Sequence, residues 1–281
     1  MLSKFKSILI VLVFIFTQFT TAQETPNPVK YTAHNKGKFY IYWGGNRDSY
    51  SKSDIHFKGD DYDFTINNVS AEDHPVGWHI NYINPTMMTI PQTNFRLGYF
   101  INDHYNISVG VDHMKYIMVQ TQTVNISGTY PSSYVGNQIN NGQVNLTDET
   151  FLTFEHTDGL NYINSEISRV DDFSKYFGIT NTDKIQINLT EGVGAGVLYP
   201  KTNAKVLGKE RHDDFHVSGY GVAAKVGLNL TFFKHYFIQG ELKAGYINMP
   251  DIRTTALTND TASQHFTFLQ RVISFGGIFN L

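Results

Sequence analysis

The sequence contains no cysteine and little charge. Without Cys, its 281 residues have neither a disulfide framework nor the residue that anchors a lipoprotein. Charged residues make up 17% of the chain, below the roughly 25% of an ordinary soluble domain. The net charge of −3 is not that of a nucleic-acid-binding protein. Beyond the first 22 residues there is also no long apolar run and no helical period of useful length.

The N-terminus predicts export. Lys4 and Lys6 precede an apolar run over residues 8–16, and small residues follow up to Ala22. This is the pattern of a secretory signal peptide over residues 1–22, because the apolar run is too short to span a bilayer as a helix. Residues 23–36 are polar and predict a periplasmic lead-in, and residues 37–281 are expected to form one domain.

Alternation of apolar and polar residues dominates the mature chain. In segment 217–233, Val222 and Leu228 share one face, while Gly221 and Lys225 share the other. Segment 236–246 repeats the pattern after only two intervening residues, which predicts an antiparallel hairpin. The same alternation occurs in 39–44, 94–101, 107–112, 185–197 and 264–281.

The composition of the two faces predicts what each one contacts. The polar face consists mostly of Gly, Ala, Asn, Ser and Thr, which suits the crowded interior of a narrow barrel better than a water-exposed surface. Tyr220, Phe232, Tyr236 and Tyr246 stand at strand ends, where interfacial girdles occur. The pattern therefore predicts an all-β, antiparallel up-and-down transmembrane β-barrel. The alternative is a soluble periplasmic lipid-binding barrel with its apolar face inward.

Charges within the strands predict a polar network in the lumen. Lys225 is not expected to face lipid, because a charge on the lipid side near mid-bilayer costs roughly 2–4 kcal/mol of folding free energy. Facing inward, it shares the interior with charged residues of other strands. The predicted lumen network consists of Arg96, Asp112, Lys225, Glu241 and Lys243.

The strand count follows from the connections. Links near 102–104 and 234–235 are short, while 119–149, 200–216 and 250–263 are long and polar, as in a barrel with two different ends. Assigning further strands to 54–67 and 77–83 gives about ten, with eight or twelve as alternatives. A barrel of this size has a largely filled lumen, because wide aqueous channels need about 16 strands. The long segments, chiefly 119–149, are expected outside the cell.

Four residues do not fit this alternation. Glu191 and Arg271 fall on the apolar face of their strands, and Phe266 and Phe268 are out of phase with the apolar residues that follow them. A β-bulge in each strand is expected to restore the phase. Otherwise the two charged residues belong near a membrane interface.

The signal peptide, the alternating strands and the strand at the C-terminus resemble the small outer-membrane β-barrel proteins of Gram-negative bacteria. Runs 39–45, 110–116 and 154–162 are similar to segments of an uncharacterised family of such barrels. The resemblance implies an outer-membrane monomer, folded by the insertion machinery and surrounded by lipid and lipopolysaccharide. It implies no activity and no functional residues. The terminal residues 279–281 depart from the usual terminal aromatic.

One cluster raises the alternative of a barrel hydrolase acting on envelope lipid or peptide. His156 and Asp158 are expected to share a face near the outer end of their strand, where the carboxylate could orient the imidazole as a general base. However, the sequence has no Gly-x-Ser-x-Gly motif and no zinc-ligand spacing of its His residues. Acidic pairs at 60–61, 171–172 and 213–214 are interpreted as solvated loop charge. We therefore expect a non-enzymatic protein without metal or cofactor, whose role is structural, binding or the passage of a narrow solute.

Overall fold

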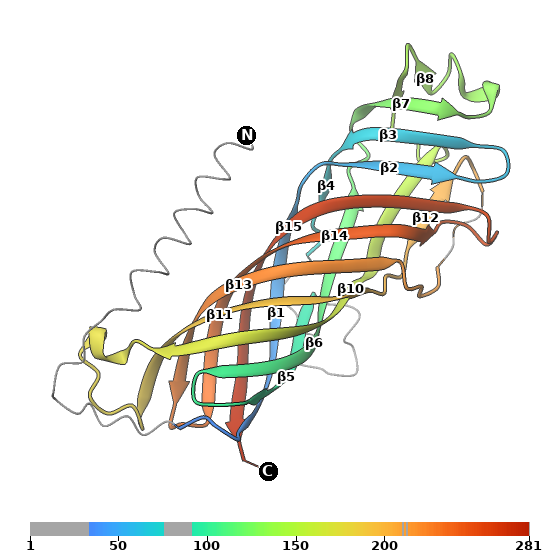
Figure 1. Ribbon diagram of the computed structural model, residues 1–281. Coiled ribbons are helices and arrows are strands. Elements are labelled where there is room, and N and C mark those ends of the chain that lie inside the picture. Colours follow the sequence, from blue (N-terminus) through green and yellow to red (C-terminus); the bar gives the residue numbers. More distant parts are fainter. Residues whose placement is uncertain (1–33, 76–91, 210, 212, 281) are drawn as a thin grey trace.

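The computed structural model describes residues 34–75, 92–209, 211 and 213–280 (Figure 1). Within these ranges, fifteen β-strands form one continuous sheet and two short 3-10 helices lie in connections. None of the described helices is long and apolar enough to cross a membrane. The predicted signal peptide, most of the 23–36 lead-in and the predicted strand at 77–83 lie outside the described residues.

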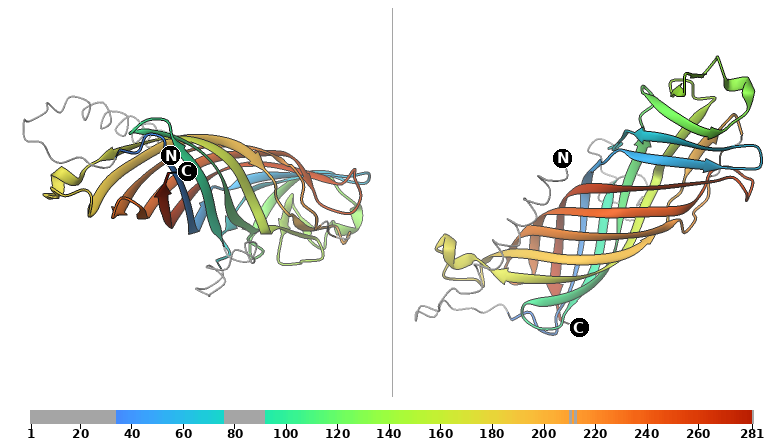
Figure 2. Two further views of the ribbon diagram at one scale, coloured as in Figure 1. Left: turned by 90° about the horizontal axis from the view of Figure 1, so that it is seen from below. Right: turned by 45° about the horizontal axis from the view of Figure 1, so that its top comes forward.

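Eight strands close a ring of backbone hydrogen bonds in the lower part of the molecule (Figures 1 and 2). The ring closes because β1 pairs with both β5 and β15. The ring therefore has eight strands, which is one of the two alternatives to the ten strands preferred in the sequence analysis. In hydrogen-bonded order the strands are β1 (Phe39–Tyr50), β5 (Thr93–Phe100), β6 (Tyr105–Met118), β10 (Leu152–Asp172), β11 (Ile185–Leu198), β13 (Gly219–Phe232), β14 (Tyr236–Arg253) and β15 (Thr261–Phe279).

The two ends of the ring differ. At the lower end in Figure 1 are the short connections 101–104 and 233–235, the connection with η5 (Ser174–Phe177), the start of β1 and the end of β15. The upper end carries the long connections and the remaining strands. These upper elements are β2 (Ser53–Lys58), β3 (Asp63–Val69), β4 (Ala71–Glu72), β7 (Thr123–Thr129), η4 (Ser132–Tyr134), β8 (Ile139–Asn140), β9 (Gln143–Asn145) and β12 (Asn203–Val206).

The segment expected to cross the membrane at 54–67 forms the hairpin β2–β3 above the ring. A strand needs about 9–11 residues to cross a bilayer, so β15, with 19, projects well beyond it. β1 pairs with β15 only from Phe268 to Phe279, which leaves the upper edge of β15 open. β2 takes that edge at Thr261–Gln264, and β3, β7, β9 and β8 extend the sheet further.

Along a single strand, the kind of residue that faces inward changes. On β14 the buried face carries Gln239, Glu241 and Lys243 in its lower half, and Ile247 and Met249 in its upper half. β14 and β15 keep one register from Tyr236 to Met249, so both sets point to the same side of the sheet. The barrel interior is therefore polar below and apolar above.

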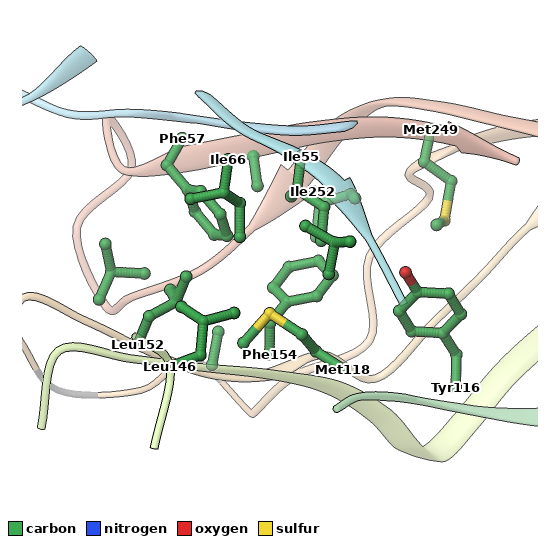
Figure 3. Close-up of a cluster of buried hydrophobic side chains, with 14 of the residues drawn as sticks. Ile55, Phe57, Ile66, Tyr116, Met118, Leu146, Leu152, Phe154, Met249 and Ile252 are labelled. Atoms are coloured by element: carbon green, nitrogen blue, oxygen red, sulfur yellow. The ribbon is translucent and has the colours of Figure 1, made fainter. Parts of the chain in front are cut away.

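The upper interior is a hydrophobic core formed by all the surrounding strands (Figure 3). Ile55, Phe57 and Ile66 of the β2–β3 hairpin face Met118 and Phe154 of the barrel wall. Phe266 and Phe268 belong to the same core, because the inward face of β15 continues into it without interruption.

This core explains why the predicted bulges are wrong at the four residues that did not fit. Over residues 264–279 of β15, and along the whole of β11, the ladders run without a shift of register. Phe266 and Phe268 point inward into the upper hydrophobic core. Glu191 and Arg271 point outward, as their positions in the alternation indicate.

Engineered disulfides can test the eight-stranded ring, since the chain has no Cys of its own. Ile41 and Leu97 are directly opposed on β1 and β5, and both are exposed. We expect Ile41→Cys with Leu97→Cys to oxidise to a disulfide, detected by loss of maleimide labelling and by peptide mass. In a ten-stranded ring, the two strands predicted at 54–67 and 77–83 would hold the thiols roughly 14 Å apart, because neighbouring strands are about 4.8 Å apart.

The matched control is Ile41→Cys with Phe95→Cys, which moves the second thiol two residues along β5, to the next position on the outward face. Diagonal pairs are about 7–8 Å apart, beyond the reach of an unstrained disulfide. Free thiols in both double variants would contradict the β1–β5 pairing.

Candidate functional site in the barrel lumen

The charged side chains of the lower interior form one cluster. The structure places all five predicted residues there, each buried and facing inward. They come from four strands of the ring, with Lys225 on β13 lying across from Lys243 on β14. Arg96, Asp112 and Glu241 complete the set. The alternation that pointed Lys225 away from lipid thus brings charges from strands far apart in the sequence into contact.

A sixth residue, Glu166 of β10, joins the whole cluster. Its Oε1 lies 2.9 Å from Arg96 Nη2 and 2.9 Å from Lys243 Nζ, while Oε2 lies 2.6 Å from Lys225 Nζ. Sequence reasoning missed this residue. The alternation could have identified it, because Glu166 falls between the outward-facing Ile163 and Ile167, on the same face as Asn164 and Ser168.

The cluster is electrically balanced, with three cations and three carboxylates. Lys243 Nζ lies 2.6 Å from Asp112 Oδ2, and Lys225 Nζ lies 3.1 Å from Glu241 Oε2. Removing charges from water costs several kcal/mol per ion, and only close, complementary partners offset that cost. Since every cation contacts at least two carboxylates, the six groups can remain charged in the closed lumen.

Neutral polar side chains tie the ions to the barrel wall. Arg96 donates from Nε to Tyr42 Oη at 3.0 Å and from Nη2 to Asn164 Oδ1 at 2.7 Å. Asp112 accepts from the side-chain amides of Asn94 and Asn164, at 2.7 and 3.0 Å. These bonds join β1, β5, β6 and β10, so the network cross-braces the ring as well as filling it.

Below the ions, the lumen holds amide, hydroxyl and aromatic side chains around a cavity of about 40 Å³ next to Lys225. Amide groups of Asn188, Asn229 and Gln239 form one part of its lining. Such a space holds a few water molecules at most. Tyr40, Tyr42, Phe100, Phe237 and Ile278 pack together and form another part of the lining. A Cβ atom at Gly98 would overlap the Tyr40 ring, so glycine is what allows that ring to lie inside.

The predicted His156–Asp158 pair does not form, and the expectation of a shared face is wrong. A register shift between His156 and Leu160, with Gly159 at a φ of +138°, turns the chain between them. His156 is fully buried in the upper core, with Nδ1 3.0 Å from Thr202 Oγ1. Asp158 is exposed and lies 3.3 Å from Lys201 Nζ. In this region, above the ion cluster, burial lowers the pKa of His156 to about 3.

Asp61 and Asp213 of the acidic pairs make ion pairs in the upper region, whereas Asp171 pairs with Arg169 and His104 at the lower end. Lys209 Nζ lies 2.6 Å from Asp61 Oδ1 and 3.5 Å from the buried Asp260 Oδ2, which fastens the tip of the β2–β3 hairpin to the β14–β15 connection. The hydrogen bond from Lys209 lowers the pKa of Asp61. Burial disfavours the charge on Lys209, but the two carboxylates outweigh it and raise its pKa. Among the described residues, no group of three or more His, Asp or Glu side chains could hold a metal ion.

Comparison with known proteins finds likeness in fold. The outer membrane protein OprG from Pseudomonas aeruginosa is 12% identical, with a TM-score of 0.36 over 89% of this chain and 99% of its own. Ail, the attachment invasion locus protein of Yersinia pestis, is 11% identical, with a TM-score of 0.31 over 87% and 99%. Neisserial surface protein A is 11% identical, with a TM-score of 0.29 over 84% and 98%.

These structural neighbours are small outer-membrane β-barrels of Gram-negative bacteria. At 11–12% identity, the likeness concerns the fold and brings no function to this chain. No protein-family model matches the sequence, and a search of curated proteins finds no match.

Replacing Glu166 tests its central position. Glu166→Gln keeps the shape but leaves three buried cations to share two carboxylates. We expect the free energy of unfolding to fall by about 3–5 kcal/mol, the usual cost of breaking a buried ion pair. Urea unfolding of the protein in lipid vesicles measures this change.

Glu149→Gln, which removes the same charge from an exposed loop, is the matched control and should stay within about 0.5 kcal/mol of the unmodified protein. Equal stability of the two variants would show that Glu166 does not hold the cluster together.

Proposed function

We propose that the chain is a non-enzymatic outer-membrane protein that spans the membrane with its eight-stranded ring and presents its upper sheet outside the cell. The reversal of polarity along continuous strands supports this proposal. In the lower half the exposed face of β14 and β15 carries Ile238, Leu242, Ile273 and Phe275, while most of the buried side chains are polar, among them Gln239, Glu241, Lys243, Gln270 and Ser274. This arrangement is stable only where the surroundings are apolar.

The upper half has the opposite arrangement, which suits water. There the outward face of β15 carries Thr261, Ser263, His265 and Thr267, and the inward face packs into the hydrophobic core. The exposed aromatic residues Tyr236 and Tyr246 of β14 are ten residues apart, about the length of a tilted strand that crosses a bilayer. A soluble lipid-binding barrel would need the upper arrangement along its whole length.

The lumen supports a role other than bulk transport. From bottom to top it holds a cavity of about 40 Å³ lined by aromatic and amide side chains, the ion cluster and the upper hydrophobic core. Side chains of the ring strands make the two lower layers, and the β2–β3 hairpin adds Ile55, Phe57 and Ile66 to the core above. We propose that the barrel is closed and serves as a rigid anchor, and that the upper sheet makes the protein's contacts outside the cell.

Segment 119–149, expected to be the main external loop, forms β7, η4, β8 and β9 at the far end of that sheet. We propose the upper sheet as the binding surface, and we propose lipid and lipopolysaccharide as the surroundings of a monomeric barrel inserted by the outer-membrane machinery. No observation favours the hydrolase, since its proposed His156 and Asp158 are held apart by different partners.

Membrane fractionation tests the location. We expect the expressed protein in the outer-membrane fraction, released only by detergent, because the lower face is a continuous apolar band. An unheated sample should migrate faster on a gel than a boiled one, since the closed ring stays folded until it is heated. Recovery in the soluble periplasm after osmotic shock would contradict the membrane proposal.

Planar-bilayer recording tests the closed lumen. We expect the inserted protein to give no large, stable conductance steps, because the ion cluster and the aromatic rings occupy the path along the barrel axis. A porin recorded under the same conditions shows that the assay detects an open channel. Stable steps of porin size from this protein would disprove the filled lumen.

A further inference from the structure

Two arginines lie opposite each other on the outer wall of the barrel. Arg47 of β1 and Arg271 of β15 are directly paired across the two strands. Both belong to the outward face, on which Trp43 and Phe275 form a pair two steps further down. Directly opposed side chains on one face have Cβ atoms about 4.5–5.5 Å apart, so the two guanidinium groups can reach a common ligand.

Their height places them at the outer edge of the apolar band. Each arginine is eight residues above the aromatic residue at the lower end of its own strand, Phe39 or Phe279. At about 3.4 Å per residue and a tilt of roughly 40°, that distance is on the order of 20 Å along the barrel axis. The apolar band of such barrels is about 25 Å tall. The pair therefore lies in the outer part of the apolar band, where the long arginine side chains can extend to the headgroups.

The surroundings make the charge of Arg271 costly without a ligand. Like charges directly opposite on a sheet destabilise it. Arg271 is exposed and lies among the exposed apolar side chains of Leu242, Leu269 and Ile273. In the proposed membrane location, lipid chains therefore surround much of its side chain. Arg47 donates from Nη1 to its neighbour's carbonyl, Asn46 O, at 2.7 Å, and is near enough to Asp73 for their charges to interact.

We propose that Arg47 and Arg271 together bind the phosphate group of an anionic lipid in the outer leaflet, and this inference rests on the proposed membrane location. Arginine presents several N–H donors in a planar fork that matches phosphate oxygens. A shared phosphate turns the repulsion between the two side chains into joint attraction. It would fix one lipid at the seam where β1 and β15 close the ring.

The test compares lipid retention by the full-length protein and its variants. Protein is inserted into phosphatidylcholine vesicles with and without lipid A, extracted in mild detergent and examined by native mass spectrometry. We expect retained lipid A on the unmodified protein and about tenfold less on Arg47→Gln with Arg271→Gln, equivalent to ~1.4 kcal/mol. Lys58→Gln with Lys52→Gln removes two exposed positive charges above the band and should retain lipid A normally.

The outcomes separate the two proposals. Insertion with equal lipid A retention by the unmodified protein and the arginine double variant overturns the phosphate site and leaves the membrane proposal standing. An equal loss with the lysine variant also overturns it, because general surface charge would then explain retention. Failure to insert into phosphatidylcholine vesicles at all, seen as the absence of a heat-modifiable gel band, overturns both.

Discussion

The structure depends on one constraint: the two faces of β14 and β15 exchange polarity partway along the strands, as the proposed passage from lipid into water requires. Below this transition, an apolar exterior surrounds a polar lumen. Above it, the same inward face carries the hydrophobic core and the outward face becomes polar. The pleat fixes which residues share a face. The polarity of each face therefore changes because the residue types change along the strand, without a shift of register.

The polar lumen follows from that constraint and creates another. A ring of eight strands is too narrow to leave inward side chains hydrated by bulk water, so they must satisfy one another. Glu166 does this by contacting all three cations, and the surrounding amides connect the ions to the wall. Removing any member of a balanced buried cluster leaves a charge with too few partners, which costs more than the net contribution of an intact pair.

Sequence alternation predicted the features that a period of two determines. The inward direction of Lys225 and the tight hairpin around Lys234 are local consequences of the pleat, and the structure has both. Phe266 and Phe268 were misread because one surrounding solvent was assumed for the whole strand. The same assumption made 54–67 a membrane strand, although an apolar inward face also suits a hairpin in water.

Other features depend on contacts that one strand does not reveal. Glu166 is central only because β10 lies across the lumen from Lys225 and Lys243, and that closure is a property of the ring. His156 and Asp158 were assigned to one face by counting residues, which fails wherever a bulge intervenes. Bulges have no reliable signal in a single sequence, although Gly159 at positive φ is consistent with one.

The long strands also explain why the upper sheet exists. Strands that project above a closed ring expose unpaired backbone groups, and such edges invite pairing with other chains. β2 covers the free edge of β15, and successive strands carry the sheet to β8, which has only two residues and offers little edge to another chain. The β2–β3 hairpin also contributes Ile55, Phe57 and Ile66 to the core. The same hairpin therefore covers the free edge of β15 and closes the top of the barrel.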